Sequence, residues 1–188
     1  MVTPFSVMTT AIAPAESRER CRRLRLVLTD CDGVLTDGQV YVSERGEELK
    51  RFSLRDGMGF ERLRGAGLAI AIVTRERSAI VSRRAEKLGV RLFQGINDKA
   101  EALPSILAEC GGTLENTAYI GDDVNDFGAM RALSPGGITA APADAEPGAL
   151  LLAHFVCTRP GGAGAFREFA EWILSNKSSD PDGNETSE

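Results

Sequence analysis

The chain of 188 residues has 43% hydrophobic residues, 26% charged residues and a net charge of -5, values typical of one soluble globular domain. Because this charge is small and Lys and Arg are scattered, the composition argues against nucleic acid or an anionic membrane as a partner. No apolar run approaches the roughly 20 residues of a membrane-spanning helix, and the N-terminus lacks the pattern of a secretory signal. The four well-separated cysteines favour reduced thiols in the cytoplasm over a zinc site or disulfides.

The first third of the chain predicts a strand, a hairpin and a helix. Residues 1–23 have a mixed composition and are expected to form a flexible or loosely helical extension. The apolar run at 24–29 predicts a buried strand. Alternation on both sides of a turn predicts a β-hairpin within 39–53. A helix closed by a glycine is expected over 56–67.

From residue 68 onwards, strands and helices alternate. Strands are predicted at 68–74, 91–95, 117–123, 137–141 and 154–158, and helices at 78–89, 99–110, 124–133 and 163–174. The polar residues 176–188 are expected to form a disordered tail. The alternating order predicts an α/β fold in which helices cover both faces of a doubly wound parallel sheet, within a single domain of residues 24–175.

Several predicted strands end in residues that can carry chemistry. Ligands of parallel sheets bind beyond the carboxyl ends of the strands. Seven polar residues fall at or shortly after such ends: Asp30, Asp32, Thr74, Lys99, Asp122, Asp123 and Asp126. Each has a simple structural explanation when taken singly, such as a turn, a helix cap or a surface charge. Their joint occurrence at one sheet edge predicts a functional site.

These residue types predict a magnesium site that handles a phosphate group. Clustered carboxylates repel one another unless a cation lies between them, and oxygen ligands without nearby cysteine or histidine favour Mg²⁺ over zinc. A carboxylate held beside phosphorus can form an aspartyl-phosphate, and a second carboxylate two residues further on can act as acid and base. The lone His154 lies in an apolar run and is expected to be structural.

Four segments resemble the motifs of the haloacid dehalogenase (HAD) superfamily of phosphotransferases: DCDGVLTDG, VTRE, the lysine of QGINDK and GDDVND. Between about residues 24 and 174, GEELKRFSLRDGMGF, RRAEKLGV and RPGGAGAFREF resemble the capless branch that hydrolyses phosphorylated 3-deoxy-2-keto sugar acids. That branch includes 3-deoxy-octulosonate 8-phosphate phosphatases and the 9-phosphate phosphatases of nine-carbon, sialic-acid-like sugars. The resemblance implies a Rossmann-like HAD fold with a β-hairpin in place of a cap domain.

The resemblance also implies a role for each motif residue. Asp30 would attack phosphorus, and Asp32 would protonate the leaving sugar oxygen and later activate water. Mg²⁺ would be bound by the carboxylates of Asp30 and Asp122 and by the backbone carbonyl of Asp32. Thr74 and Lys99 would hold phosphoryl oxygens.

Further positions match the family in supporting roles. Asp126 is a candidate for orienting Lys99, and Asp123 is a second supporting acidic residue. Five residues match positions that contact the substrate in the family: Ser53, Arg55, Asp56, Gly57 and Arg84.

Departures from the family pattern leave the sugar open. Arg75 stands where the family usually has glycine, so it alters the backbone or adds a charge near the phosphate. Octulosonate enzymes carry arginine at the next position and tend to carry it at Glu61, whereas Glu76 together with Lys87 resembles the nine-carbon sugar phosphatases. Glu76 and Lys87 also have a simple interpretation as exposed helix charges.

Other classes of protein share parts of this pattern. A receiver domain combines a similar set of residues, but its acidic pair comes first and its acceptor aspartate lies on a later strand, which is the opposite order. A regulatory domain that has lost catalysis is disfavoured because every central position holds a competent residue. A phosphatase of another small phosphorylated metabolite stays open.

The chain also predicts an assembly. Only about forty residues separate the first two motifs, too few for a cap domain that would cover the substrate. The predicted hairpin presents four apolar side chains: Val40, Val42, Leu49 and Phe52. The resembling family forms tetramers that bury such hairpins. A homotetramer is therefore expected, with active sites near the subunit interfaces and RPGGAGAFREF as a candidate for part of the pocket wall.

Overall fold

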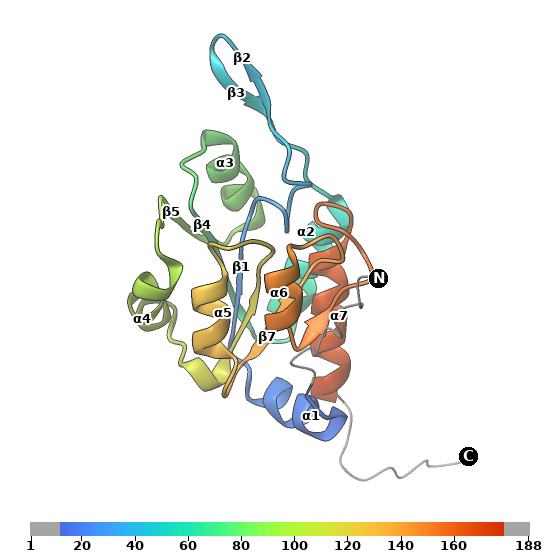
Figure 1. The fold of residues 1–188 in the computed structure, drawn as a ribbon. Helices are drawn as coiled ribbons and strands as arrows, with labels where there is room; N and C mark the ends of the chain where they lie inside the picture. The colour runs from blue at the N-terminus through green and yellow to red at the C-terminus, as the bar shows by residue number, and fades with distance from the viewer. Residues whose placement is uncertain (1–11, 179–188) are drawn as a thin grey trace, which may run out of the picture.

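A computed structural model describes residues 12–178, which fold around one parallel β-sheet (Figure 1). The strands lie in the order β5-β4-β1-β6-β7-β8. They are β1 (Leu26–Thr29), β4 (Ala69–Thr74), β5 (Arg91–Gln94), β6 (Thr117–Ile120), β7 (Ile138–Ala141) and β8 (Phe155–Val156). The chain moves outward from β1 to one side and then to the other, which is the order of a doubly wound sheet and confirms the predicted α/β fold.

Seven α-helices in the described part of the chain cover the two faces of this sheet. They are α1 (Pro14–Arg23), α2 (Leu54–Gly65), α3 (Ala79–Leu88), α4 (Lys99–Cys110), α5 (Phe127–Leu133), α6 (Pro147–Leu152) and α7 (Ala165–Ser178). Packed apolar side chains place α1, α2, α3 and α7 over one face and α4, α5 and α6 over the other. A short 3₁₀ helix, Leu114–Asn116, precedes β6.

The strand β1 shows how the sequence builds the two layers of core. All four of its residues are buried. Val27 packs with the α2 and α7 layer, whereas Leu26 and Leu28 pack with the α4 and α5 layer. In register with Val27 lie Ile70 of β4 and Ala118 of β6. A continuous apolar run is therefore what a strand covered on both faces requires.

Helix ends agree with the local signals. The hydroxyl of Ser78 accepts a hydrogen bond from the Val81 N–H at the start of α3, and Gly89 ends that helix with φ 64°. The α4 helix has the predicted bounds, and the Asp98 carboxylate accepts bonds from the first free backbone N–H groups. Such caps act within a few residues, so the sequence predicts them directly.

Residues 14–23 were expected to be flexible or loosely helical, and they form the ordered helix α1, which packs against α7. The Arg20 guanidinium donates to the carbonyl oxygens of Ser134 and Gly137 at 2.7 and 2.8 Å. The Lys177 ammonium donates to three carbonyls at the C-terminal end of α1. These contacts come from distant parts of the chain. The domain limits stay a prediction, and residues 1–11 and 179–188 lie outside the described residues.

Several boundaries and one helix also differ from the prediction, and α7 extends to Ser178, into residues that were expected in the disordered tail. The strand β6 ends at Ile120 rather than at residue 123, and α5 begins only at Phe127. The intervening residues turn around the Asp126 carboxylate, which accepts bonds from the N–H groups of Asp122 and Asp123. The helix α6 was not predicted, since its six residues form a short apolar run with no clear helical period.

The predicted hairpin projects from the body of the molecule, as β2 (Tyr41–Ser43) and β3 (Gly46–Leu49) (Figure 1). Every residue of the two strands is exposed. Phe52 is an exception to the expected apolar surface, because it packs partly buried against the core and lies under the Arg84 guanidinium. The other three apolar residues of the hairpin are exposed as expected.

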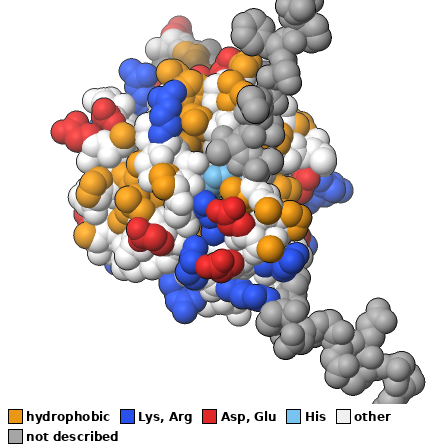
Figure 2. Space-filling model, turned by 60° about the horizontal axis from the view of Figure 1, so that its bottom comes forward, with side chains coloured by type: hydrophobic (Ala, Val, Ile, Leu, Met, Phe, Trp, Pro, Cys, Tyr) orange, Lys and Arg blue, Asp and Glu red, His pale blue; other side chains and the backbone are white. Residues whose placement is uncertain are grey.

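The surface carries mixed charge. On the face shown in Figure 2, basic and acidic side chains are interspersed with hydrophobic ones. Among the described residues, no helix has the length and apolar character that crossing a membrane requires.

Candidate active site

The central strand β1 ends at the two aspartates of the D-x-D motif. It lies between β4 and β6, at the switch point where ligands of doubly wound sheets bind. The Asp30 N–H donates to the Ile120 carbonyl at 3.0 Å, which extends the pairing with β6 by one residue. Asp30 is buried and Asp32 is half-buried. The apolar strand thus fixes one carboxylate in the protein interior and places the second near solvent.

Asp126 is the fully buried centre of the acidic turn that follows β6. Its Oδ1 accepts hydrogen bonds from the Lys99 ammonium and from the Tyr119 hydroxyl, both at 2.6 Å. Its Oδ2 accepts bonds from the N–H groups of Asp122 at 2.8 Å and Asp123 at 3.3 Å. Four donors therefore satisfy this carboxylate, and they fix the backbone that presents Asp122.

Lys99 lies between two carboxylates at the start of α4. Its ammonium is 2.8 Å from Asp30 Oδ1 and 2.6 Å from Asp126 Oδ1, and its side chain is 1% exposed. Burial opposes the charged form of Lys99, but Asp30 and Asp126 outweigh it and raise the pKa of the ammonium. A permanent positive charge is therefore held beside Asp30.

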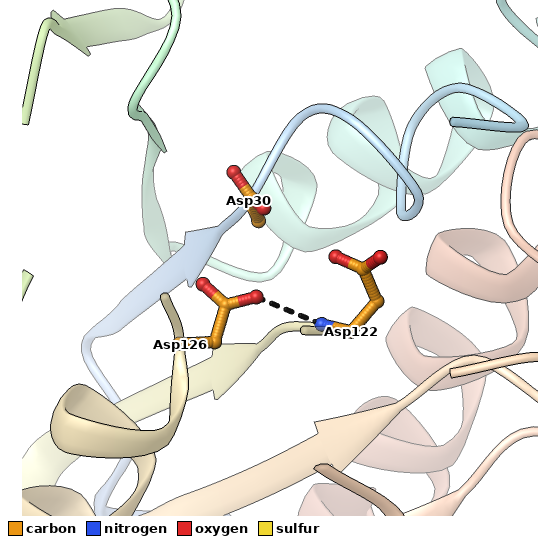
Figure 3. Close-up of side chains that lie close together, drawn as sticks. All are labelled: Asp30, Asp122 and Asp126. Atoms are coloured by element: carbon orange, nitrogen blue, oxygen red, sulfur yellow. Dashed lines mark hydrogen bonds between the residues drawn. The ribbon is translucent and has the colours of Figure 1, made fainter. Parts of the chain in front are cut away.

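Asp30 and Asp122 form the candidate metal site. Figure 3 shows both carboxylates beyond the strand ends, together with Asp126, and ligand atoms of the three lie within 4.8 Å of one another. Because the Asp126 oxygens already accept four bonds, Asp30 and Asp122 are the better ligands. Asp122 Oδ1 is buried and has no hydrogen-bond partner among the described residues.

The electrostatics of this pair fit a divalent cation. Burial, followed by the charge of Asp126, raises the pKa of Asp30. Burial, followed by the charge of Asp30, raises the pKa of Asp122. Both carboxylates are thus costly to ionise together without a counter-charge. Hard oxygen donors with no cysteine or histidine in the cluster suit Mg²⁺.

Gly33 allows the first motif to approach Asp122. Its φ is +86°, and a Cβ built on it would lie 1.9 Å from Asp122 Oδ2. An alanine at this position would therefore meet both backbone strain and a direct clash with the candidate metal ligand. The glycine after the second aspartate is a requirement of the site.

A cavity of about 230 Å³ opens over these residues. The residues that line it include Asp30, Asp32, Thr74, Asp122 and Asp123. Arg75 and Glu76, two of the departures from the family pattern, lie in its wall and are exposed. Lys99 is buried beneath Asp30. A larger hollow of about 720 Å³ between α2 and α7 contains none of the strand-end residues.

The residues matched to substrate contacts fall into different places. The Ser53 hydroxyl caps α2 by accepting bonds from backbone N–H groups, and the Ser53 carbonyl accepts a bond from Arg84 at 3.1 Å. Gly57 is buried beside Arg84, and a Cβ there would lie 3.1 Å from Arg84 Nη2. Arg84 Nε is buried and has no hydrogen-bond partner among the described residues.

Three of the matched residues lie apart from the carboxylate cluster. Asp56 is buried, and its carboxylate accepts bonds from the N–H groups of Gly164 and Arg167 at 3.2 and 2.9 Å. Arg55 lines a separate hollow with arginines of the α7 region. Lys87 is exposed in the last turn of α3 and does not line the 230 Å³ cavity.

The structure adds two residues that the sequence interpretation missed. The Tyr119 hydroxyl lies beneath the site and donates to Asp126. Lys50 directly follows the hairpin strand β3, and its ammonium lies 2.6 Å from Asp32 Oδ1. Lys50 is part of GEELKRF, a segment that resembles the family but has no local pattern indicating a contact with Asp32. His154 is half-buried and bonded to Thr139, which agrees with a structural histidine.

The doubly wound sheet, the D-x-D strand end and the buried Lys99 between two aspartates define a phosphatase of the HAD type. No protein-family model matches the chain. The curated protein 3-deoxy-D-manno-octulosonate 8-phosphate phosphatase KdsC of Yersinia pestis is 41% identical over 157 residues, which cover 83% of this chain and 82% of that protein.

Solved structures agree with this match. A Moraxella catarrhalis 3-deoxy-D-manno-octulosonate 8-phosphate phosphatase, in complex with magnesium, phosphate and KDO, has 35% identity and a TM-score of 0.80, covering 86% of this chain and 92% of that chain. A Legionella pneumophila structure assigned to HAD superfamily (subfamily III A) hydrolases has 35% identity and a TM-score of 0.80, covering 87% and 88%.

The chain belongs to the KdsC family of HAD-superfamily phosphatases. It is therefore a phosphoric monoester hydrolase, and its cofactor is Mg²⁺, in agreement with the acidic cluster. These findings confirm the resemblance and the class of enzyme predicted from the sequence, and they contradict the receiver-domain alternative.

Proposed function

We propose that the enzyme hydrolyses the phosphate ester of a 3-deoxy-2-keto sugar acid, with 3-deoxy-D-manno-octulosonate 8-phosphate as the first candidate. The observation that carries the proposal is the Lys99 ammonium held between Asp30 and Asp126, beside a carboxylate pair that fits Mg²⁺. The choice of sugar is supported by relatives named for this reaction at 36% and 41% identity.

A nine-carbon keto sugar acid 9-phosphate is the second candidate. Glu76 lines the cavity above the carboxylates, where octulosonate enzymes carry arginine. An acidic wall at this position favours a sugar that presents hydroxyl or ammonium groups there. Arg75 beside it adds a cation at the same opening.

In the proposed reaction, Asp30 attacks phosphorus and forms an aspartyl-phosphate while the bond to the sugar oxygen breaks. Asp32 gives a proton to that oxygen. Asp32 then takes a proton from water, which attacks the aspartyl-phosphate and releases inorganic phosphate with Asp30 restored.

The remaining polar groups would stabilise the charge of the transferring phosphoryl group. Asp30, Asp122 and the backbone carbonyl of Asp32 would hold Mg²⁺, which neutralises negative charge on the phosphate when bound. Lys99 and Thr74 would bind phosphoryl oxygens. Positive groups preorganised where charge develops typically provide the largest catalytic contribution, about 3–4 kcal/mol for each donor.

The experiment is phosphate release from eight- and nine-carbon keto sugar acid phosphates in the presence of Mg²⁺. We expect turnover of at least one, its loss in EDTA and its return on adding Mg²⁺. The Asp30→Asn variant should lose about 1,000-fold or more in kcat while circular dichroism shows that it is still folded, whereas Glu109→Gln, an exposed charge on α4, should be unaffected. Full activity without metal, or in a folded Asp30→Asn variant, would contradict the mechanism.

We also propose a homotetramer in the cytoplasm. The assembly is supported by exposed apolar residues on the projecting hairpin, with Val42 69% and Leu49 61% exposed. Such a surface is larger than a free two-stranded ribbon usually carries. The compartment is supported by the four cysteines, which are all free thiols.

A further inference from the structure

Lys50 brings a buried positive charge to the site from outside the four strand-end motifs. It directly follows β3, and its side chain is 4% exposed. Its ammonium lies 2.6 Å from Asp32 Oδ1 and 3.4 Å from Glu47 Oε2. Exposed surface ion pairs usually contribute little to stability. Lys50, in contrast, has a buried side chain and is bonded to the carboxylate that we propose as the acid and base, so its loss should affect catalysis.

The two oxygens of Asp32 have different surroundings. Oδ1 receives the Lys50 ammonium and, at 3.3 Å, the hydroxyl of buried Thr36. Oδ2 is buried and has no hydrogen-bond partner among the described residues. Asp32 itself lies in the loop after β1 and lines the cavity. With Oδ1 held by two donors, Oδ2 is the carboxylate oxygen that is free of hydrogen bonds from the described residues and so is left to exchange a proton.

We propose that Lys50 is a positioning residue: it holds Asp32 Oδ1 so that Oδ2 faces the oxygen that leaves the phosphate. The inference rests on the proposed function of Asp32 as acid and base. Proton transfer requires the carboxyl oxygen within hydrogen-bond reach of the leaving atom, and a carboxylate free to rotate about its Cβ–Cγ bond would meet this condition only part of the time.

The same contact joins the hairpin to the catalytic loop. Lys50 and Asp32 are 18 residues apart, and Glu47 on β3 also accepts a hydrogen bond from the Ser78 hydroxyl at the start of α3. The base of the hairpin is thus held at two points beside the cavity. A change in the hairpin would therefore be transmitted to Asp32 through Lys50.

The experiment compares two aryl phosphates that differ in how much they need a proton. The nitrophenolate of 4-nitrophenyl phosphate departs without protonation, whereas the less acidic phenol of phenyl phosphate gains more from it. Neither carries a sugar or a carboxylate. The ratio kcat/KM covers the steps up to departure of the leaving group, so it isolates the acid step from later hydrolysis of the aspartyl-phosphate.

For Lys50→Met, we expect kcat/KM to fall about 10- to 100-fold more with phenyl phosphate than with 4-nitrophenyl phosphate. Lys50→Arg, which can still donate to Oδ1, should recover part of the difference. Arg45→Met removes a cation from the exposed turn of the same hairpin and should change neither value. Melting curves report folding, and Lys50→Gln replaces Lys50→Met if the latter does not fold.

Equal losses with both substrates, or no loss, would overturn the proposal and leave Lys50 with a structural role. A loss seen only as a raised KM for sugar acid phosphates would also overturn it, in favour of substrate binding. Failure of the proposed function is distinguishable, because the wild-type enzyme would then turn over neither aryl phosphate nor sugar phosphate.

Discussion

At the active site, the buried negative charges of the aspartates are neutralised or hydrogen-bonded by specific side chains. Lys99 contributes one positive charge to Asp30 and Asp126, and Tyr119 adds a neutral donor below. Removing one partner of a buried ion pair commonly costs 3–5 kcal/mol, because the other charge stays buried. The acidic turn after β6 thus depends on Lys99 for stability as well as for any bond to phosphate.

His154 provides a test of buried ionisation away from the site. Its Nδ1 accepts the Thr139 N–H at 3.1 Å, and its Nε2 lies 3.2 Å from the Ser134 hydroxyl. Burial, helped by the nearby Arg20 charge, lowers the pKa of His154 from 6.5 to about 4. Between these values the unfolded chain binds a proton that the folded chain does not, so stability falls as the pH decreases.

We predict that, in the His154→Gln variant, the stability of the fold depends less on pH between pH 7 and pH 4. Melting temperatures measured from pH 7 to pH 4 should fall less steeply in the variant than in the wild type, because the variant has no imidazole to protonate. Other groups titrate equally in both proteins and cancel in the comparison. Parallel curves would show that His154 does not contribute.

At the scale of elements, helices α2 and α7 pack closely and share one polar contact. Phe60 and Phe166 stack with ring centroids 4.3 Å apart, and Gly59 allows this approach, since a Cβ there would lie 3.1 Å from Phe166. Asp56 on α2 accepts bonds from the N–H groups of Gly164 and Arg167, around the first turn of α7. One carboxylate therefore caps a helix that lies more than a hundred residues further along the chain.

We predict that Asp56→Ala destabilises the fold rather than weakening substrate binding. One buried and one partly buried N–H group lose their acceptor, which should lower the free energy of unfolding by about 1–3 kcal/mol. Urea denaturation measures this change, and KM for the sugar phosphate should stay within about twofold. A large rise in KM at unchanged stability would instead support the substrate contact that the family resemblance implies.

At the scale of the whole molecule, the projecting hairpin is the feature that the single chain leaves without a covering layer (Figure 1). Tyr41, Val42 and Leu49 are all more than 60% exposed there. A two-stranded hairpin is only marginally stable by itself. Association of such hairpins would stabilise them and place a neighbouring chain beside the open cavity.

We predict that light scattering shows about four chains per particle and that Val42→Asp reduces this number. The introduced charge would be buried without a partner in the assembly. Leu114→Asp, at an exposed site in the 3₁₀ helix before β6, is the matched control and should leave the assembly intact. A fully active monomer of the wild type would refute the shared site.

The sequence by itself determined the features that depend on short stretches. The cap residues Ser78 and Gly89 predicted the bounds of α3, and the apolar runs predicted the positions of the strands. The meeting of Asp30 with Asp122 was also predictable, because parallel strands bring their carboxyl ends to one edge. The motif order then distinguished a HAD phosphatase from a receiver domain.

Only the tertiary structure decided the contacts between distant residues. The charged sequence of α1 has no apolar stripe that predicts its packing, and Arg20 and Lys177 hold it by bonds to carbonyls elsewhere in the chain. No local sequence pattern predicts the partners of Asp56 and Lys50, because those partners are distant in sequence. Local periodicity describes an element and the face it buries, whereas the choice among polar partners depends on which elements the folded core brings together.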